Sequence, residues 1–143
     1  MKLTYEPARE SDVETIYALS KALIDAYEDV GRIDYDEALA WTRRKIEKRI
    51  SAYTRVMLDG RLAGYYRFEP SGERMELDDL YVLPAYRGRG VGTAIVERCC
   101  RQTSAPVFLY VFAKNRGAVA LYARLGFQIV ERVSDTRYIM QRG

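Results

Sequence analysis

The stretch Leu80-Tyr81-Val82-Leu83-Pro84-Ala85-Tyr86-Arg87-Gly88-Arg89-Gly90-Val91-Gly92-Thr93 leads from an apolar strand pattern through a glycine-rich loop into a helix pattern. Helices usually begin with Ser, Thr, Asp or Asn, whose side chains cap free backbone amides, and acidic residues are favoured in the first turn. This helix instead begins among alternating glycines and two arginines. Its positive end lacks a negative partner from the adjacent sequence, so we expect an external anion to supply one.

A phosphate or pyrophosphate is the anion that suits such a loop best. Glycines let a ligand approach the backbone closely, and the uncapped amides at a helix start donate hydrogen bonds to phosphate oxygens. The spacing matches neither the P-loop, Gly-x-x-x-x-Gly-Lys-Ser/Thr, nor the dinucleotide fingerprint, Gly-x-Gly-x-x-Gly. An ordinary glycine-rich turn without a ligand is the alternative interpretation.

Composition restricts the classes of protein and of chemistry that fit. The 143 residues are 48% apolar and 30% charged with a formal net charge of +3, which predicts one globular domain spanning residues 1–143 and makes nucleic acid an unlikely partner on charge alone. The longest apolar run, Val107 to Ala113, is too short to cross a membrane, and the start resembles no secretory signal, so we expect a cytoplasmic protein without a membrane partner.

Histidine is absent, and the two cysteines, Cys99 and Cys100, are adjacent. This excludes Ser-His and Cys-His nucleophile pairs and every zinc site that contains histidine, and we expect no metal. Catalysis would then rely on carboxylates, tyrosine, backbone groups or a cofactor.

Hydrophobic periodicity predicts an alternation of strands and helices. Ser11 with Glu14 indicates a capping box at the start of the first helix. The second helix carries a basic run, Arg43 to Arg49, which we interpret as a solvated face, with contact to nucleic acid or a membrane as the alternative. The expected elements are strands at 2–6, 53–58, 62–68, 74–83, 107–112, 128–133 and 137–141, and helices at 11–27, 36–50, 90–103 and 115–125.

Three motifs in order resemble the GNAT superfamily of N-acetyltransferases. The loop Arg87-Gly88-Arg89-Gly90-Val91-Gly92 is similar to the Arg/Gln-x-x-Gly-x-Gly/Ala signature that holds the pyrophosphate of coenzyme A in that family. The segment Asp78–Val82 resembles its fourth strand, and Asn115–Phe127, with Ala118, Leu121 and Tyr122, resembles its next motif. The periodicity predicts one α/β domain in the order β-α-α-β-β-β-α-β-α-β-β. This order matches the family, and the expected GNAT-like fold is a mixed, mostly antiparallel sheet of about seven strands flanked by four helices.

The alternation of apolar residues changes phase within the fourth strand. Leu77 cannot share a face with Leu80 and Val82 in a strand of strict period two, so we predict a β-bulge near Asp78–Leu80 that splays this strand from its neighbour. The resemblance implies that the pantetheine of acetyl-CoA lies along Leu80, Tyr81 and Val82 like an added strand. An edge bulge without function is the alternative.

Acetyl transfer to an amine benefits from a base, because a primary ammonium is protonated at neutral pH. Asp78 is our first candidate, directly or through a water, with Glu76 and Asp79 as alternatives and a structural salt bridge as the non-catalytic reading of Asp78. The backbone amide of Leu80, freed by the bulge, is the expected oxyanion donor. Tyr122 matches the tyrosine that serves as general acid in the family and is expected to protonate the departing thiolate, with a packing role as the alternative.

The resemblance assigns cofactor binding to two segments and two single residues. We expect Asn115 to cap its own helix and also to contact the cofactor. The expected cofactor-binding residues are Leu80, Tyr81, Val82, Arg87, Gly88, Arg89, Gly90, Val91, Gly92, Thr93, Asn115 and Tyr122.

The acceptor site of GNAT proteins is formed mainly by the first two helices and their connection. Acids and aromatics gather there and predict attraction of a cationic amine, with a solvated loop as the alternative. The expected acceptor-binding residues are Asp25, Tyr27, Glu28 and Glu76, with Asp29 and Tyr35 nearby.

Together these features predict an acetyl-CoA-dependent N-acetyltransferase that acts on a primary amine (a small molecule, lysine or peptide N-terminus) by direct attack in a ternary complex. The rival hypothesis is a non-catalytic acyl-CoA-binding sensor or regulatory module, which would bind the cofactor without releasing thiol when an amine is added. The oligomeric state stays open, with a homodimer among the alternatives.

Overall fold

A seven-stranded sheet organises the protein in the computed structural model, which describes residues 2–143. The strand order is β1-β2-β3-β4-β5-β7-β6, and every pair is antiparallel except β4 with β5. The strands are β1 Leu3–Pro7, β2 Tyr53–Leu58, β3 Arg61–Ser71, β4 Arg74–Val82, β5 Val107–Phe112, β6 Gln128–Arg132 and β7 Arg137–Arg142; the α-helices are α1 Val13–Tyr27, α2 Tyr35–Arg49, α3 Val91–Arg101 and α4 Arg116–Arg124. The predicted element order and α/β fold are confirmed.

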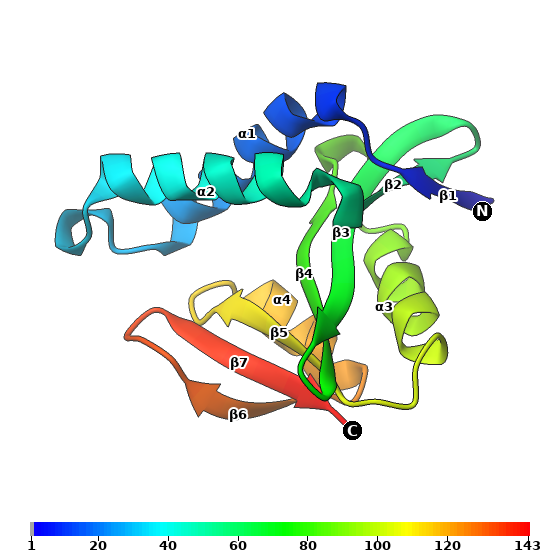
Figure 1. Ribbon diagram of the computed structural model, residues 1–143. Coiled ribbons are helices and arrows are strands. Elements are labelled where there is room, and N and C mark those ends of the chain that lie inside the picture. Colours follow the sequence, from blue (N-terminus) through cyan, green and yellow to red (C-terminus); the bar gives the residue numbers. More distant parts are fainter. Residues whose placement is uncertain (1) are drawn as a thin grey trace.

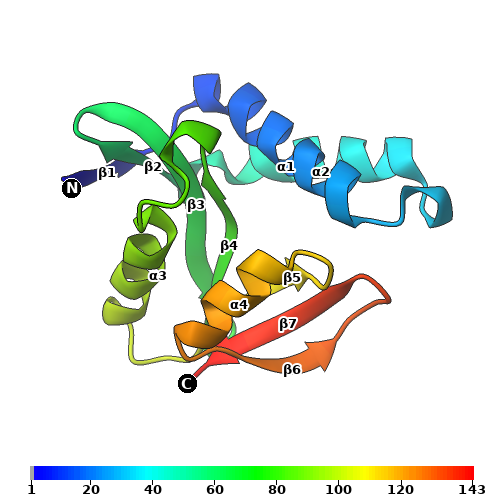
Figure 2. The same cartoon turned by 180° about the vertical axis from the view of Figure 1, so that it is seen from behind.

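The sheet has a hydrophobic core on each face, because residues in a strand alternate between the two sides. One core packs α1 and α2 against the sheet through Ile16, Ile46, Tyr65 and Tyr81. The other packs α3 and α4 against the opposite face and includes Val91, Ile95, Cys99, Leu77 and Tyr122. Figures 1 and 2 show α1 and α2 crossing one end of the sheet, while α3 and α4 lie on its other side.

The predicted bulge in β4 is confirmed. Tyr65 of β3 pairs with Tyr81, and Arg67 pairs with Asp78, so one β3 residue lies opposite two β4 residues. Asp79, one of these two β4 residues, has a left-handed φ of 49°, which costs a non-glycine residue about 1 kcal/mol or more. The bulge turns Leu80 and Val82 to the same core as Leu77, as the phase change in the sequence indicated.

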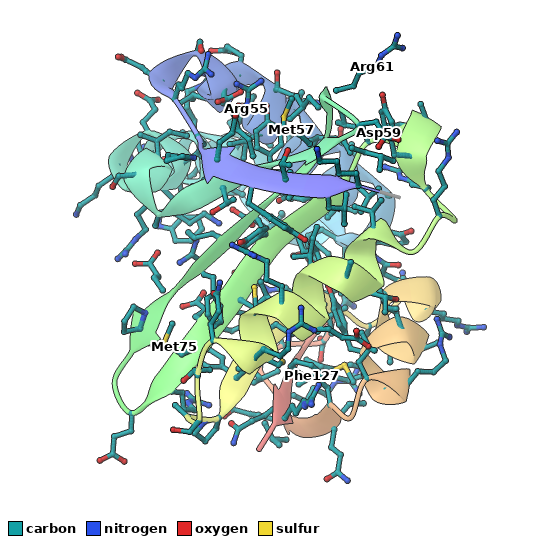
Figure 3. All side chains as sticks on the ribbon, turned by 90° about the vertical axis from the view of Figure 1, so that its right-hand side faces the viewer. Arg55, Met57, Asp59, Arg61, Met75 and Phe127 are labelled. Atoms are coloured by element: carbon teal, nitrogen blue, oxygen red, sulfur yellow. The ribbon has the colours of Figure 1, made fainter. Side chains whose placement is uncertain are left out.

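Beyond the bulge, β4 and β5 diverge. These parallel strands pair only at Met75 with Val107 and at Glu76 with Phe108, near the β3–β4 turn where Figure 3 shows Met75. From there the two strands separate toward the end of the sheet that α1 and α2 cross (Figure 1). Within residues 2–143, the splay leaves the second half of β4 without a paired strand on the side that faces β5.

The start of α1 differs from the prediction. The chain forms a short 3-10 turn at Glu10–Asp12 before α1 begins at Val13. The Ser11–Glu14 capping box is therefore wrong. The buried Asp12 instead closes the 3-10 turn by accepting a hydrogen bond from the Arg9 amide at 2.8 Å, and it also accepts one from the Tyr65 hydroxyl of β3 at 2.7 Å. Asp12 is the N-cap residue of α1 but makes no side-chain cap with this helix.

β3 approaches the bulged strand β4 closely at Gly64. A Cβ on Gly64 would lie 2.2 Å from the carbonyl oxygen of Tyr81, a backbone atom that cannot swing aside. We expect Gly64→Ala to lower the free energy of unfolding by about 3 kcal/mol, because the strands must shift apart. Urea unfolding followed by circular dichroism measures this change.

Gly117 is the matched control for that substitution. It lies in α4, and a Cβ there would meet no atom within 4 Å. Gly117→Ala should raise stability by up to about 1 kcal/mol through helix propensity. Equal stabilities of the two variants would contradict the packing argument.

Candidate functional site

The splay between β4 and β5 opens a cavity of about 640 Å³. α1 and α2 close one end, and the loop before α3 together with α4 closes the other. Its lining is Ser20, Leu23, Ile24, Tyr27, Trp41, Thr42, Lys45, Leu77–Val82, Arg87, Gly88, Gly92, Leu109–Phe112, Asn115, Gly117, Ala118, Leu121, Tyr122 and Arg137. Sequence segments more than 100 residues apart therefore meet at one site.

The beginning of α3 is uncapped, as its sequence predicts. Gly90 is the N-cap residue in left-handed geometry, with φ of 82°, and no side chain of residues 2–143 caps the helix or adds an acid to its first turn. Gly88 is also left-handed, with φ of 75°, and a Cβ on Gly88 or Gly90 would point into open space. The first amides of α3 and the positive end of its dipole are thus available to an anion.

Asp79 on the bulge is held by three side chains. Lys45 of α2 makes an ion pair with its carboxylate at 3.1 Å, the Tyr81 hydroxyl donates to it at 3.1 Å, and the Tyr53 hydroxyl donates a short hydrogen bond. Burial alone would raise the pKa of Asp79, but the Lys45 charge and the Tyr53 hydrogen bond outweigh burial and lower it. Asp79 is therefore an ionised structural anchor with its oxygens already engaged.

Asp78 is in the opposite electrostatic situation. Its side chain is 20% exposed and lines the cavity, and its one contact with a cation is to Arg67 at 3.4 Å, an arginine that Glu69 and Glu76 bind more closely. Burial, reinforced by the adjacent Asp79 carboxylate, raises the pKa of Asp78 to about 7 despite the Lys45 and Arg67 charges. Near neutral pH, Asp78 can therefore both release and accept a proton.

Tyr122 lies across the cavity on α4. The residue is buried, and its ring packs 5.9 Å from that of Phe127. Its hydroxyl makes no hydrogen bond with any other side chain or backbone group of residues 2–143. Burial and the nearby Asp78 charge raise the pKa of Tyr122, so the phenol keeps its proton at neutral pH.

Residues 16–127 of the sequence match the acetyltransferase (GNAT) family. The chain belongs to this family. It is 34% identical over 74 residues to an uncharacterised N-acetyltransferase of Methanocaldococcus jannaschii, covering 49% of this chain and 33% of the relative. It is also 34% identical over 112 residues to a mycothiol acetyltransferase of Corynebacterium efficiens, covering 68% of this chain and 37% of the relative. The chain thus spans well under two thirds of the length of these relatives.

Solved structures support the GNAT fold over nearly the whole chain. The PaiA N-acetyltransferase of Thermoplasma acidophilum, solved in complex with coenzyme A, superposes with a TM-score of 0.71 at 18% identity and 99% coverage of both chains. An acetyltransferase from Thermus thermophilus gives a TM-score of 0.74 at 20% identity and covers 99% of this chain. Similarity at this level of identity establishes the fold.

The structure brings most of the expected cofactor-binding residues to the cavity. Leu80, Tyr81, Val82, Arg87, Gly88, Gly92, Asn115 and Tyr122 line it, whereas Arg89, Gly90, Val91 and Thr93 do not. The Val91 side chain packs in the core at 1% exposure, and the Arg89 guanidinium lies 5.6 Å from the Tyr86 ring. Asn115 caps α4 as predicted by accepting a hydrogen bond from the Ala118 amide at 3.3 Å.

Three expected acceptor-binding residues lie outside the cavity. Asp25 is bound by Lys21 and Tyr35 on the surface, Glu28 accepts a hydrogen bond from Thr136, and Glu76 forms an ion pair with Arg67. Of the expected set, only Tyr27 lines the cavity. The first helix turns Tyr27 inward and Asp25 outward, and other side chains engage all three acids.

Lys45, Trp41 and Arg137 line the cavity although sequence reasoning did not single them out as site residues. The solvated-face interpretation of the basic run is wrong for Lys45, whose side chain is 18% exposed and paired with Asp79. For Arg43 the solvated-face interpretation omits two contacts, because this side chain forms an ion pair with Glu14 and stacks on the Tyr17 ring. Trp41 and Lys45 stand four residues apart on one helical face, and that spacing was the available signal.

Among residues 2–143, no cluster of three or more His, Cys, Asp or Glu is arranged to hold a metal ion. The same part of the chain has no helix with both the length and the apolar character to cross a membrane. Cys99 is fully buried in the core, and burial raises the pKa of its thiol to about 12, which makes it a poor nucleophile.

The opposite environments of Asp78 and Asp79 predict opposite effects on stability. The folded state binds a proton at Asp78 up to about pH 7, whereas an unfolded carboxyl loses it near pH 3.9. The ionised Asp78 therefore destabilises the fold increasingly as pH rises through this window. We expect Asp78→Asn to be more stable than the unchanged protein by about 2 kcal/mol at pH 8, with the difference vanishing near pH 4.

Asp79→Asn provides the matched comparison, because asparagine tolerates left-handed geometry. It should lose about 3 kcal/mol at pH 8, since Lys45 is left without its buried partner. Urea unfolding at pH 5 and pH 8 measures both variants. Destabilisation of Asp78→Asn at pH 8 would show that Asp78 is a structural ion-pair residue.

Proposed function

We propose that this chain transfers an acetyl group from acetyl-CoA to a primary amine by direct attack in a ternary complex. The observation that carries the proposal is one cavity that joins an uncapped helix start to a proton acceptor, Asp78, and a proton donor, Tyr122. Membership of the GNAT family and relatives named as an N-acetyltransferase and as an acetyltransferase agree with it.

The cofactor end of the cavity suits a diphosphate joined to an amide-bearing chain. The amides at the start of α3 would hold the diphosphate, with Gly88 and Gly90 leaving space for its approach. The splayed half of β4, Leu80–Val82, would pair with the amides of pantetheine as an added strand. Arg87 at present donates from Nε to the Val82 carbonyl at 2.9 Å, so its terminal nitrogens remain for the phosphates.

Asp78 is the best-placed proton acceptor among the three candidate acids. Its raised pKa matches proton transfer near neutral pH, and its carboxylate faces the cavity. Asp79 is ionised but engaged by Lys45, Tyr53 and Tyr81, and Glu76 lies outside the cavity beside Arg67. Asp78 would take one proton from the substrate ammonium and leave a neutral, nucleophilic amine.

Acetyl-CoA supplies the acetyl group as a thioester, in which the C–S bond breaks as the new C–N bond forms. The Leu80 amide, at the bulge where the regular pairing with β3 is interrupted, would donate a hydrogen bond to the carbonyl oxygen as negative charge develops there. Tyr122 would protonate the departing sulfur and recover a proton from the nitrogen. The ammonium thus loses two protons: Tyr122 accounts for one, which ends in the thiol, and Asp78 releases the other to solvent.

Tyr122→Phe tests the proton donor. The hydroxyl has no protein partner within residues 2–143, so its removal leaves no buried group unsatisfied. We expect kcat to fall about 100-fold while the dissociation constant of coenzyme A is unchanged. Thiol release measured with a chromogenic disulfide gives the rate, and calorimetry gives the affinity. An unchanged kcat at every pH would reassign Tyr122 to packing.

Gly92 tests the anion site at the start of α3. A Cβ there makes only ordinary contacts, at 3.6 Å to Leu121 and 3.9 Å to Val82, so both Gly92→Asp and Gly92→Asn should fold. The aspartate would place a negative charge where the diphosphate binds. We expect coenzyme A to bind about tenfold more weakly to Gly92→Asp than to Gly92→Asn. Equal calorimetric affinities would refute binding of the diphosphate at this helix start.

A further inference from the structure

Arg137, at the start of β7, is an unpaired cation on the cavity wall. It forms no ion pair or side-chain hydrogen bond with the rest of the described chain. Its guanidinium instead lies 5.5 Å from the Tyr110 ring and 5.9 Å from the Phe112 ring. Of the other cations of the cavity, Lys45 is paired with Asp79, and Arg87 binds the Val82 carbonyl through Nε and lies at the end of the cavity proposed for the cofactor phosphates. Arg137 therefore remains available to a substrate anion.

The acids of the cavity limit how many positive charges a substrate can carry. Asp78 and Asp79 are the carboxylates that line it. Asp79 already accepts from Lys45, Tyr53 and Tyr81, which leaves Asp78 to face one ammonium. A second ammonium would have no partner there and would meet Arg137 instead. The charge balance disfavours diamines and favours an acceptor with one amine and one negative group.

The strand register places the two charges far apart. Glu76 pairs with Phe108 and Phe112 pairs with Arg137, so Arg137 lies about two residues farther along the sheet than Asp78 and one strand beyond β5. That offset places Arg137 about 7 Å from Asp78 along the strand direction. The spacing between the strands increases the separation further. Apolar side chains of the cavity, including Leu23, Ile24 and Tyr27, cover the α1 side.

Resting on the proposed function, we propose that the acceptor is an extended ω-amino carboxylate. Its amine would lie at Asp78, its methylene chain would lie against the apolar wall, and Arg137 would bind its carboxylate. The planar guanidinium suits this partner because it presents two parallel donors to the two carboxylate oxygens. An α-amino group is too close to its own carboxylate to reach both residues. Arg137 is thus a specificity residue for the acceptor.

Three amines of equal carbon count test this proposal: ω-aminohexanoate, hexylamine and hexamethylenediamine. They differ only in the group at the far end, which is negative, neutral or positive. We expect kcat/KM for ω-aminohexanoate to exceed that for hexylamine by about tenfold or more, with the diamine the poorest. Arg137→Gln should bring the ratio of the first two close to one. Arg61→Gln, a surface arginine that points into solvent at the β2–β3 turn (Figure 3), should leave it unaltered.

A binding measurement separates this inference from the proposed function. Trp41 is the one tryptophan of the sequence, is 56% exposed and lines the cavity, so its fluorescence reports ligand binding without acetyl transfer. If no amine releases thiol, the proposed function fails, and tighter, Arg137-dependent binding of ω-aminohexanoate still upholds the acceptor class. Preference for the diamine, or a ratio unaffected by Arg137→Gln in both assays, overturns the inference while leaving acetyl transfer intact.

Discussion

The ion pair between Lys45 and Asp79 is the contact on which the site depends. Asp79 occupies a left-handed conformation that costs a non-glycine residue about 1 kcal/mol or more. Lys45, Tyr53 and Tyr81 offset that cost by engaging its carboxylate at a mostly buried position. Because Lys45 belongs to α2, the same contact holds the helix that closes one end of the cavity against the bulged strand. Strand geometry and cavity shape are therefore coupled through one carboxylate.

Two adjacent carboxylates acquire opposite properties from this arrangement. Asp79 receives the cation and stays ionised, whereas Asp78 is buried beside a negative neighbour and its pKa is raised. The bulge enforces the division, since in a regular strand adjacent side chains would face opposite sides of the sheet. A structural anchor and a proton acceptor can then occupy consecutive positions at one cavity.

The two ends of the cavity rely on different parts of the chain. At the α3 end, backbone amides are left uncapped and glycines leave open space beside them, and these features follow from a short local motif. At the α1–α2 end, side chains from distant segments meet, as Tyr27 and Phe112 do with their rings 6.2 Å apart. Local motifs therefore indicated the first end well, whereas the acids expected at the second, Asp25, Glu28 and Glu76, found partners elsewhere.

The sequence alone determined the order of the elements, the uncapped start of α3 and the bulge in β4, because each follows from spacing, periodicity or turn chemistry within about a dozen residues. It also determined that Asp78, Asp79 and Tyr122 were the residues to weigh. Only the tertiary structure decided that Lys45 pairs with Asp79, that the pKa of Asp78 is raised and that Arg137 has no ion-pair partner within residues 2–143. Those properties depend on Lys45, Arg67 and Arg137, whose distances to the acids are set by how helices and strands pack and not by their separation along the chain.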